Sequence, residues 1–154
     1  MTGSYPIGLS TYWRQIMMKE KIPFQVFFDG SPKGYSCIKM NGVPTVESNE
    51  NILRSVGLPI SIMGRTKSQR AEYIALIYLL LNVSDYDFHE VTGDCDNVIL
   101  QMQGANRVKD KTLKILYDKC QEIILKNGLT LEYSHVKRDY NPAGIWLEHY
   151  IKQY

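Results

Sequence analysis

The sequence has no long apolar run. Its longest apolar stretch, Ile74 to Leu81, is much shorter than the roughly 20 residues that span a bilayer. The N-terminus also lacks a positively charged segment followed by an apolar one, which a secretory signal would need. We therefore expect a soluble, cytoplasmic protein that has no membrane partner.

Cysteine, glycine and proline are also scarce. Cys37, Cys95 and Cys120 are odd in number, far apart and form no CxxC pair, which argues against a disulfide framework and against a zinc cluster. With 11 Gly, 6 Pro and 44% hydrophobic residues, the composition excludes collagen-like, low-complexity and disordered chains. A chain of 154 residues fits one domain around a single core, and we expect a monomer.

The net charge of +2 is too small to indicate nucleic-acid binding. Its distribution is uneven, because residues 1–100 sum to −1 and residues 101–154 to +3. Any surface that faces a polyanion should therefore lie toward the C-terminus, or around a metal that offsets local acids.

Hydrophobic patterns and turn residues divide the chain into an extension, residues 1–22, with a short helix over 11–19, and a domain, residues 23–154. Asn41-Gly42 predicts a hairpin turn, and residues 47–57 are either a loop or a strand continuation. We predict strands over 23–31, 34–40, 58–63, 88–94 and 129–137, and helices that carry the apolar residues of 71–81, then 97–103, 111–126 and the residues from 141 onward.

Strands that first form a meander and later alternate with helices are typical of a mixed sheet covered by helices, an α/β layered domain. The second half of the pattern includes a helix that is apolar nearly all round. Such a helix is normally buried in the middle of a domain.

Three acids occupy places where sites form in α/β domains. Asp29 and Asp94 end predicted strands, and Glu72 lies in the first turn of the buried helix. If these carboxylates converge, their repulsion and lost hydration call for a cation, and hard oxygen ligands suit Mg²⁺ or Mn²⁺. The alternative is that each acid only forms a turn or caps a helix.

Four ordered motifs, FFDGS, RAEYIAL, VTGDCDNVILQMQG and LEYSHVKRDYN, resemble the type 1 ribonuclease H family, especially its compact plant-like and prokaryotic branch. The resemblance covers roughly residues 23–148. It implies a ribonuclease H-like α/β fold with a mixed five-stranded sheet and helices on both faces. It also implies an endonuclease that hydrolyses the RNA strand of RNA–DNA hybrids with two Mg²⁺ or Mn²⁺ ions.

The resemblance places three of the family's metal ligands on Asp29, Glu72 and Asp94. A fourth acid usually opens the last helix, where this chain has Gly144 or, in a longer spacing, Ile145. Neither residue can bind a metal. We expect the side-chain oxygen of Asn141 to replace the acid, with Glu148 or water as alternatives.

The same resemblance suggests substrate contacts. The backbone amides of Gly30 and Ser31 would lie near a phosphate, and Gln101 would contact the hybrid. For Ser31 and Gln101, a turn and a helix surface are equally good explanations.

The family's basic protrusion is missing, and Arg107, Lys109 and Lys111 form only a small substitute patch. We expect His135 to be structural, and Cys95 to be a small buried thiol, because no histidine is placed to activate it. The rival hypothesis is a catalytically impaired module that binds nucleic acid or a protein partner.

Overall fold

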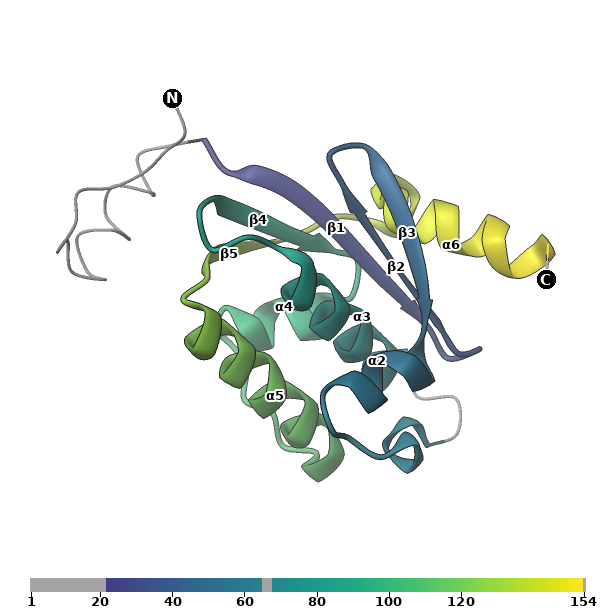
Figure 1. The fold of residues 1–154 in the computed structure, drawn as a ribbon, viewed down its shortest axis with the longest axis horizontal. Helices are drawn as coiled ribbons and strands as arrows, with labels where there is room; N and C mark the ends of the chain where they lie inside the picture. The colour runs from purple at the N-terminus through teal and green to yellow at the C-terminus, as the bar shows by residue number, and fades with distance from the viewer. Residues whose placement is uncertain (1–21, 65–67, 154) are drawn as a thin grey trace, which may run out of the picture.

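The computed structural model describes residues 22–64 and 68–153, which build a five-stranded sheet with helices on both faces (Figure 1). The strand order is β3-β2-β1-β4-β5. The strands are β1 (Phe24–Ser31), β2 (Tyr35–Met40), β3 (Val43–Ser48), β4 (Phe88–Gly93) and β5 (Thr130–His135). The helices are α2 (Asn49–Ser55), α3 (Ser68–Asn82), α4 (Asp96–Met102), α5 (Lys111–Asn127) and α6 (Pro142–Gln153), with short 3-10 turns η1 (Ile60–Met63) and η2 (Arg138–Tyr140).

The sheet is mixed, as the sequence predicts. Strand β1 pairs antiparallel with β2 and parallel with β4, and β4 pairs parallel with β5. The register sets Phe27 opposite Thr92. Because the pairing is parallel, Asp29 near the end of β1 and Asp94 directly after β4 lie at the same end of the two strands.

Helix α3 is the centre of the main core. Every residue from Ala71 to Ile77 is buried, because the sheet, α2, α4 and α5 all pack around the helix. The prediction of a buried helix from its all-round apolar sequence is confirmed. Glu72 is the one carboxylate in that buried stretch.

A second, smaller core lies on the other face of the sheet. Helix α6 crosses β1 and β2 there (Figure 1), and its Ala143 and Leu147 are buried against Cys37 of β2. The two faces therefore hold the start of α6 and the start of α3 on opposite sides of β1.

The Asn41-Gly42 turn is confirmed, but its predicted partner strand is wrong. Asn41 and Gly42 have φ values of 52° and 76°, as this type of hairpin requires, and they join β2 to β3 (Val43–Ser48). The run 58–63 instead ends in the turn η1. Pro44 conceals the strand in the sequence, and it is tolerated because β3 is an edge strand.

The segment 47–57 is neither a loop nor a continued strand over most of its length. Residues 49–55 form α2, because the Ser48 hydroxyl accepts a hydrogen bond from the Asn51 backbone N–H at 3.1 Å and caps the helix. Glu50 and Arg54 then pair across one turn at 2.8 Å. Short polar helices of this kind give little hydrophobic periodicity.

The remaining helices and strands lie where the sequence predicts them, to within a few residues. Helix α5 begins at a cap in which the Asp110 carboxylate accepts from the Leu113 N–H at 2.9 Å, and it ends at Gly128 in the left-handed conformation. The predicted helix over 11–19 lies outside the described residues. Among the helices that the structure describes, none is long and apolar enough to cross a membrane.

We predict that Gly30→Ala destabilises the fold by roughly 2–3 kcal/mol. A Cβ atom at this position would overlap the carbonyl oxygen of Ala71 in α3, so strand and helix would have to separate. Urea denaturation measures the free energy of unfolding, with the neighbouring Ser31→Ala as the control. Equal stability of both variants would contradict this close approach of β1 and α3.

Candidate active site

Asp29, Glu72 and Asp94 converge at one edge of the sheet. Asp29 lies near the end of β1, Asp94 directly follows β4, and Glu72 projects from the beginning of α3. One carboxylate oxygen from each residue lies within 4.8 Å of the others. Asp29 and Glu72 are only 5% and 6% exposed. The sequence-predicted cluster therefore exists as a largely buried group of acids.

Glu72 is held by the backbone of β1. Its Oε1 accepts a hydrogen bond from the Gly30 N–H at 3.1 Å, which the close approach of Gly30 to α3 makes possible. Its Oε2 is buried and has no hydrogen-bond partner. The Gly30 N–H, which the resemblance places near a phosphate, donates to Glu72 in this structure.

The environment favours protonation of two of these acids. Burial, opposed in part by hydrogen bonding to Glu72, raises the pKa of Asp29 to about 6, and the nearby Asp94 charge adds to the rise. Burial and the Asp29 charge also raise the pKa of Glu72 well above its usual range. Raised pKa values mean that the negative charges of these carboxylates lack nearby positive charge to stabilise them.

A divalent cation fits this deficit. The donor set consists of hard carboxylate oxygens, which Mg²⁺ and Mn²⁺ prefer. The unpartnered Glu72 Oε2 is an orphaned acceptor of the kind that a bound ion satisfies. The residues present therefore fit a metal ion. A bound ion would explain why three acids lie together in a largely buried place.

Asn141 is fully buried beside the cluster. Its Nδ2 donates to Asp94 Oδ2 at 2.9 Å and to the Phe28 carbonyl at 3.0 Å, while its Oδ1 accepts from the Ala143 N–H at 3.2 Å. These three partners fix the orientation of the amide. The Oδ1 atom, which we expected to bind a metal, accepts a hydrogen bond at the start of α6. The Nδ2 atom donates to Asp94 and orients it.

Gly144 faces the acids directly. A Cβ atom on this residue would lie 3.2 Å from Asp29 Oδ2 and 3.4 Å from Asp94 Oδ2. A carboxylate at position 144 would therefore point into the cluster, where the resemblance to the ribonuclease H family implies a fourth acid. Ile145 is 46% exposed and is the weaker candidate for that position.

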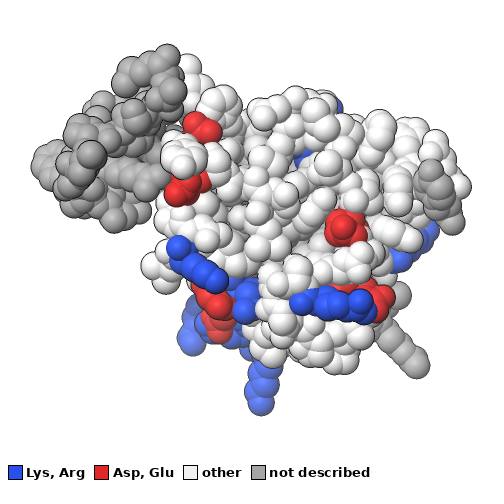
Figure 2. Space-filling view, viewed as in Figure 1, with Lys and Arg blue, Asp and Glu red and all other residues white. Residues whose placement is uncertain are grey.

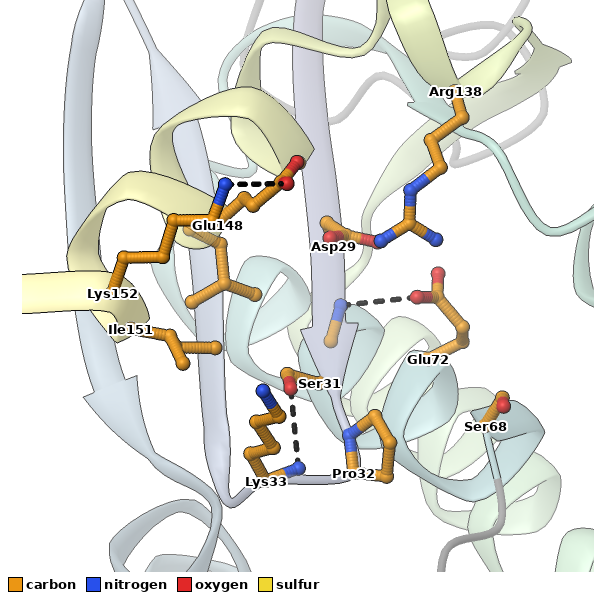
Figure 3. A pocket seen from close by; sticks show the side chains of 13 residues that line it. Asp29, Ser31, Pro32, Lys33, Ser68, Glu72, Arg138, Glu148, Ile151 and Lys152 are labelled. Atoms are coloured by element: carbon orange, nitrogen blue, oxygen red, sulfur yellow. Dashed lines mark hydrogen bonds and ion pairs between the residues drawn. The ribbon is translucent and has the colours of Figure 1, made fainter.

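A pocket of about 410 Å³ opens over Asp29 and Glu72. Arg138, Lys33 and Lys152 line it, and Figure 3 shows the Arg138 side chain directed toward the acids. The Arg138 charge lowers the pKa of Asp29, although less than burial raises it. Sequence reasoning missed Arg138 as a residue of the site. The only feature of the sequence that could have indicated it is its position three residues before Asn141.

The other predicted residues fall into two groups. Ser31 lines the same pocket. Gln101 does not, since it is buried at a second pocket that Arg107 and Lys109 also line. Its Oε1 accepts from the Tyr73 hydroxyl at 2.5 Å.

His135 and Cys95 lie close to Asp94 without belonging to the acid cluster. The His135 Nε2 lies 3.2 Å from the Asp94 carbonyl oxygen, so the ring contacts the backbone beside the cluster. Burial raises the pKa of Cys95, which keeps the thiol protonated and agrees with a structural residue.

Basic residues of the C-terminal part are spread over the surface. On the face shown in Figure 2, Lys and Arg side chains gather over α5 and α2 at the bottom of the view, interspersed with acids. On α5, Lys114 pairs with Asp118 and Lys119 with Glu122. The acids of these pairs are already counted in the sum of +3 for residues 101–154, so the excess comes from basic residues outside the two pairs.

We predict that Asp29→Asn stabilises the metal-free protein at neutral pH. Because the pKa of Asp29 is about 6 in the folded protein and its ordinary value is 3.8, the folded state binds more protons between these values. Stability then falls as the pH rises from about 4 through 6. The free energy of unfolding of the variant should exceed that of the wild type by roughly 1–3 kcal/mol at pH 7.5 and by little at pH 4.

Urea denaturation in EDTA at both pH values measures this difference. A gain of the same size at pH 4 and pH 7.5 would show that the carboxylate of Asp29 does not titrate as described.

No protein-family model matches the sequence, and no curated protein matches it. Solved structures do match. RNase H1 from the halophilic archaeon Halobacterium salinarum is 20% identical, with a TM-score of 0.62 over 86% of this chain and 100% of that one. LC11-RNase H1, isolated from compost by a metagenomic approach, is 21% identical, with a TM-score of 0.64 over 85% and 96%.

LC11-RNase H1 has also been solved in complex with an RNA/DNA hybrid. That structure is 23% identical to this chain, with a TM-score of 0.58 over 77% of this chain and 88% of the other. The shared features are the mixed five-stranded sheet and its flanking helices. The chain therefore has the fold of the type 1 ribonucleases H.

Proposed function

We propose that this protein is a metal-dependent endonuclease that hydrolyses the RNA strand of RNA–DNA hybrids. The observation that carries the proposal is the cluster of Asp29, Glu72 and Asp94, with a buried, unpartnered Glu72 oxygen, at the sheet edge of a ribonuclease H fold. Mg²⁺ or Mn²⁺ is the expected cofactor, and two ions are the expected number.

In this proposal the three acids hold the ions. Two divalent ions in such a site supply charge stabilisation to the attacking and leaving oxygens of an in-line displacement. Asp29 is central, because both Glu72 and Asp94 interact with it. Asn141 acts by holding Asp94 in place, since its own oxygen accepts from Ala143.

Recognition of RNA would come from the same pocket. Glu72 lines this pocket, and its carboxylate would meet a ribose 2′-hydroxyl, the group that distinguishes RNA from DNA. Ser31 and Lys33 line the adjacent wall and would contact the RNA backbone. The surface near Gln101 and Arg107 would meet the hybrid farther from the acids.

Gly144 favours one rival, a module that binds a hybrid or a protein without cleaving. Gly144 offers no carboxylate where the family pattern has one. We prefer the enzyme because three clustered acids, two of them buried, destabilise the metal-free fold, and a binding module would have no need of them.

The test of the proposal is cleavage of a labelled RNA–DNA hybrid beside single-stranded RNA and both homoduplexes. We expect only the RNA of the hybrid to be cut, with Mg²⁺ or Mn²⁺ and not with EDTA. Asp29→Asn and Asp94→Asn should each lower the rate at least roughly 100-fold without loss of hybrid binding, while Asp118→Asn on α5 leaves it unchanged. No cutting by folded protein with either metal would support the binding module.

Asn141 provides a separate prediction. Asn141→Ala should weaken Mn²⁺ binding roughly 10- to 100-fold, because Asp94 loses the donor that orients it. Isothermal titration with Mn²⁺ measures the change. Wild-type affinity in Asn141→Ala would exclude a positioning role.

A further inference from the structure

The acid cluster is open on the side of α6. Three carboxylates come from β1, β4 and α3, and the residue of α6 that points at them is Gly144. Asn141, at the start of the same helix, turns its nitrogen toward Asp94. A cation held by the three acids would therefore meet no carboxylate from α6 at position 144 or 141.

Glu148 lies one helical turn after Gly144 and lines the same pocket as Asp29 and Glu72. Residues four apart share a helix face, and helical side chains lean toward the N-terminus of their helix. The side chain of Glu148 can therefore extend over Gly144, where no Cβ blocks it. Figure 3 shows Glu148 at the rim of the pocket, on the side of Asp29 away from Arg138.

Glu148 forms a weak, exposed ion pair with Lys152. Its Oε1 lies 3.2 Å from the Lys152 Nζ, and the two side chains are 57% and 70% exposed. Exposed pairs of this kind contribute little to stability. A divalent cation beside Asp29 can therefore compete with Lys152 for this carboxylate.

We propose that Glu148 supplies the fourth carboxylate of the cation centre, displaced by one turn of α6 from the usual position. The proposal rests on the use of divalent cations in the proposed function. In the metal-free protein Glu148 pairs with Lys152. In the loaded protein its carboxylate leaves Lys152 and faces the cation held by Asp29, over the space that Gly144 leaves open.

The decisive experiment is isothermal titration of the metal-free protein with Mn²⁺, supported by the apparent Mn²⁺ constant for hybrid cleavage. Glu148→Gln should weaken the Mn²⁺ affinity of the weaker binding step at least roughly tenfold. The matched control is Glu50→Gln on α2, where Glu50 pairs with Arg54 at the same spacing. We expect that control to bind Mn²⁺ as the wild type does.

A double-mutant cycle tests the exchange of partners. Lys152→Gln should tighten Mn²⁺ binding two- to fivefold, because Glu148 is then free, and this gain should vanish when Glu148→Gln is also present. An equal gain in both backgrounds would assign the effect to net charge alone and overturn the proposal. Wild-type Mn²⁺ affinity in Glu148→Gln would overturn it as well.

These outcomes are separable from those of the proposed function. If the wild type binds Mn²⁺ with help from Glu148 but does not cut the hybrid, the proposed function fails and the fourth carboxylate stands. If the wild type cuts the hybrid and Glu148→Gln changes neither the Mn²⁺ affinity nor the apparent Mn²⁺ constant for cleavage, the proposed function is supported and the role of Glu148 as fourth carboxylate is wrong.

Discussion

Mutual repulsion among three carboxylates within 4.8 Å of one another is the constraint around which this site is built. The fold brings only a few donors to the group. Gly30 donates its backbone N–H to Glu72, and Asn141 donates its side-chain N–H to Asp94. These contacts hold the oxygens in place, and Arg138 offsets only part of the negative charge, which is the condition under which a buried site attracts a cation.

The constraint also explains why the acids come from such distant parts of the chain. Parallel pairing of β1 with β4 puts two strand ends at one edge, and the passage of α3 beneath that edge adds Glu72. Gly30 is required because strand and helix approach so closely there that a side chain would overlap Ala71. On the remaining side Asn141, directly before α6, donates to the Phe28 carbonyl of β1 and to Asp94 after β4, while Gly144 leaves the space beside them open.

Much of the fold and the acid cluster could be predicted from the sequence, because both follow from strong local patterns. The apolar run of α3 indicates a buried helix, and acids at strand ends indicate a site. The edge strand β3 was missed because Pro44 argues against a strand. The polar helix α2 was missed because it is defined by its cap at Ser48, and its short sequence has little hydrophobic periodicity. The orientation of the Asn141 amide depends on partners 113 and 47 residues away, which no local pattern contains.

The burial of α3 from Ala71 to Ile77 ties the site to the cooperativity of the whole domain. Amides in the middle of this helix can exchange with solvent only when the sheet, α5 and the helix separate together, so they belong to the last unit to open. Glu72 lies at the N-terminal end of this buried stretch. Its hydrogen bond from the Gly30 N–H ties the glutamate to β1, so the two acids from β1 and α3 share the protection of the central core rather than that of the outer helices.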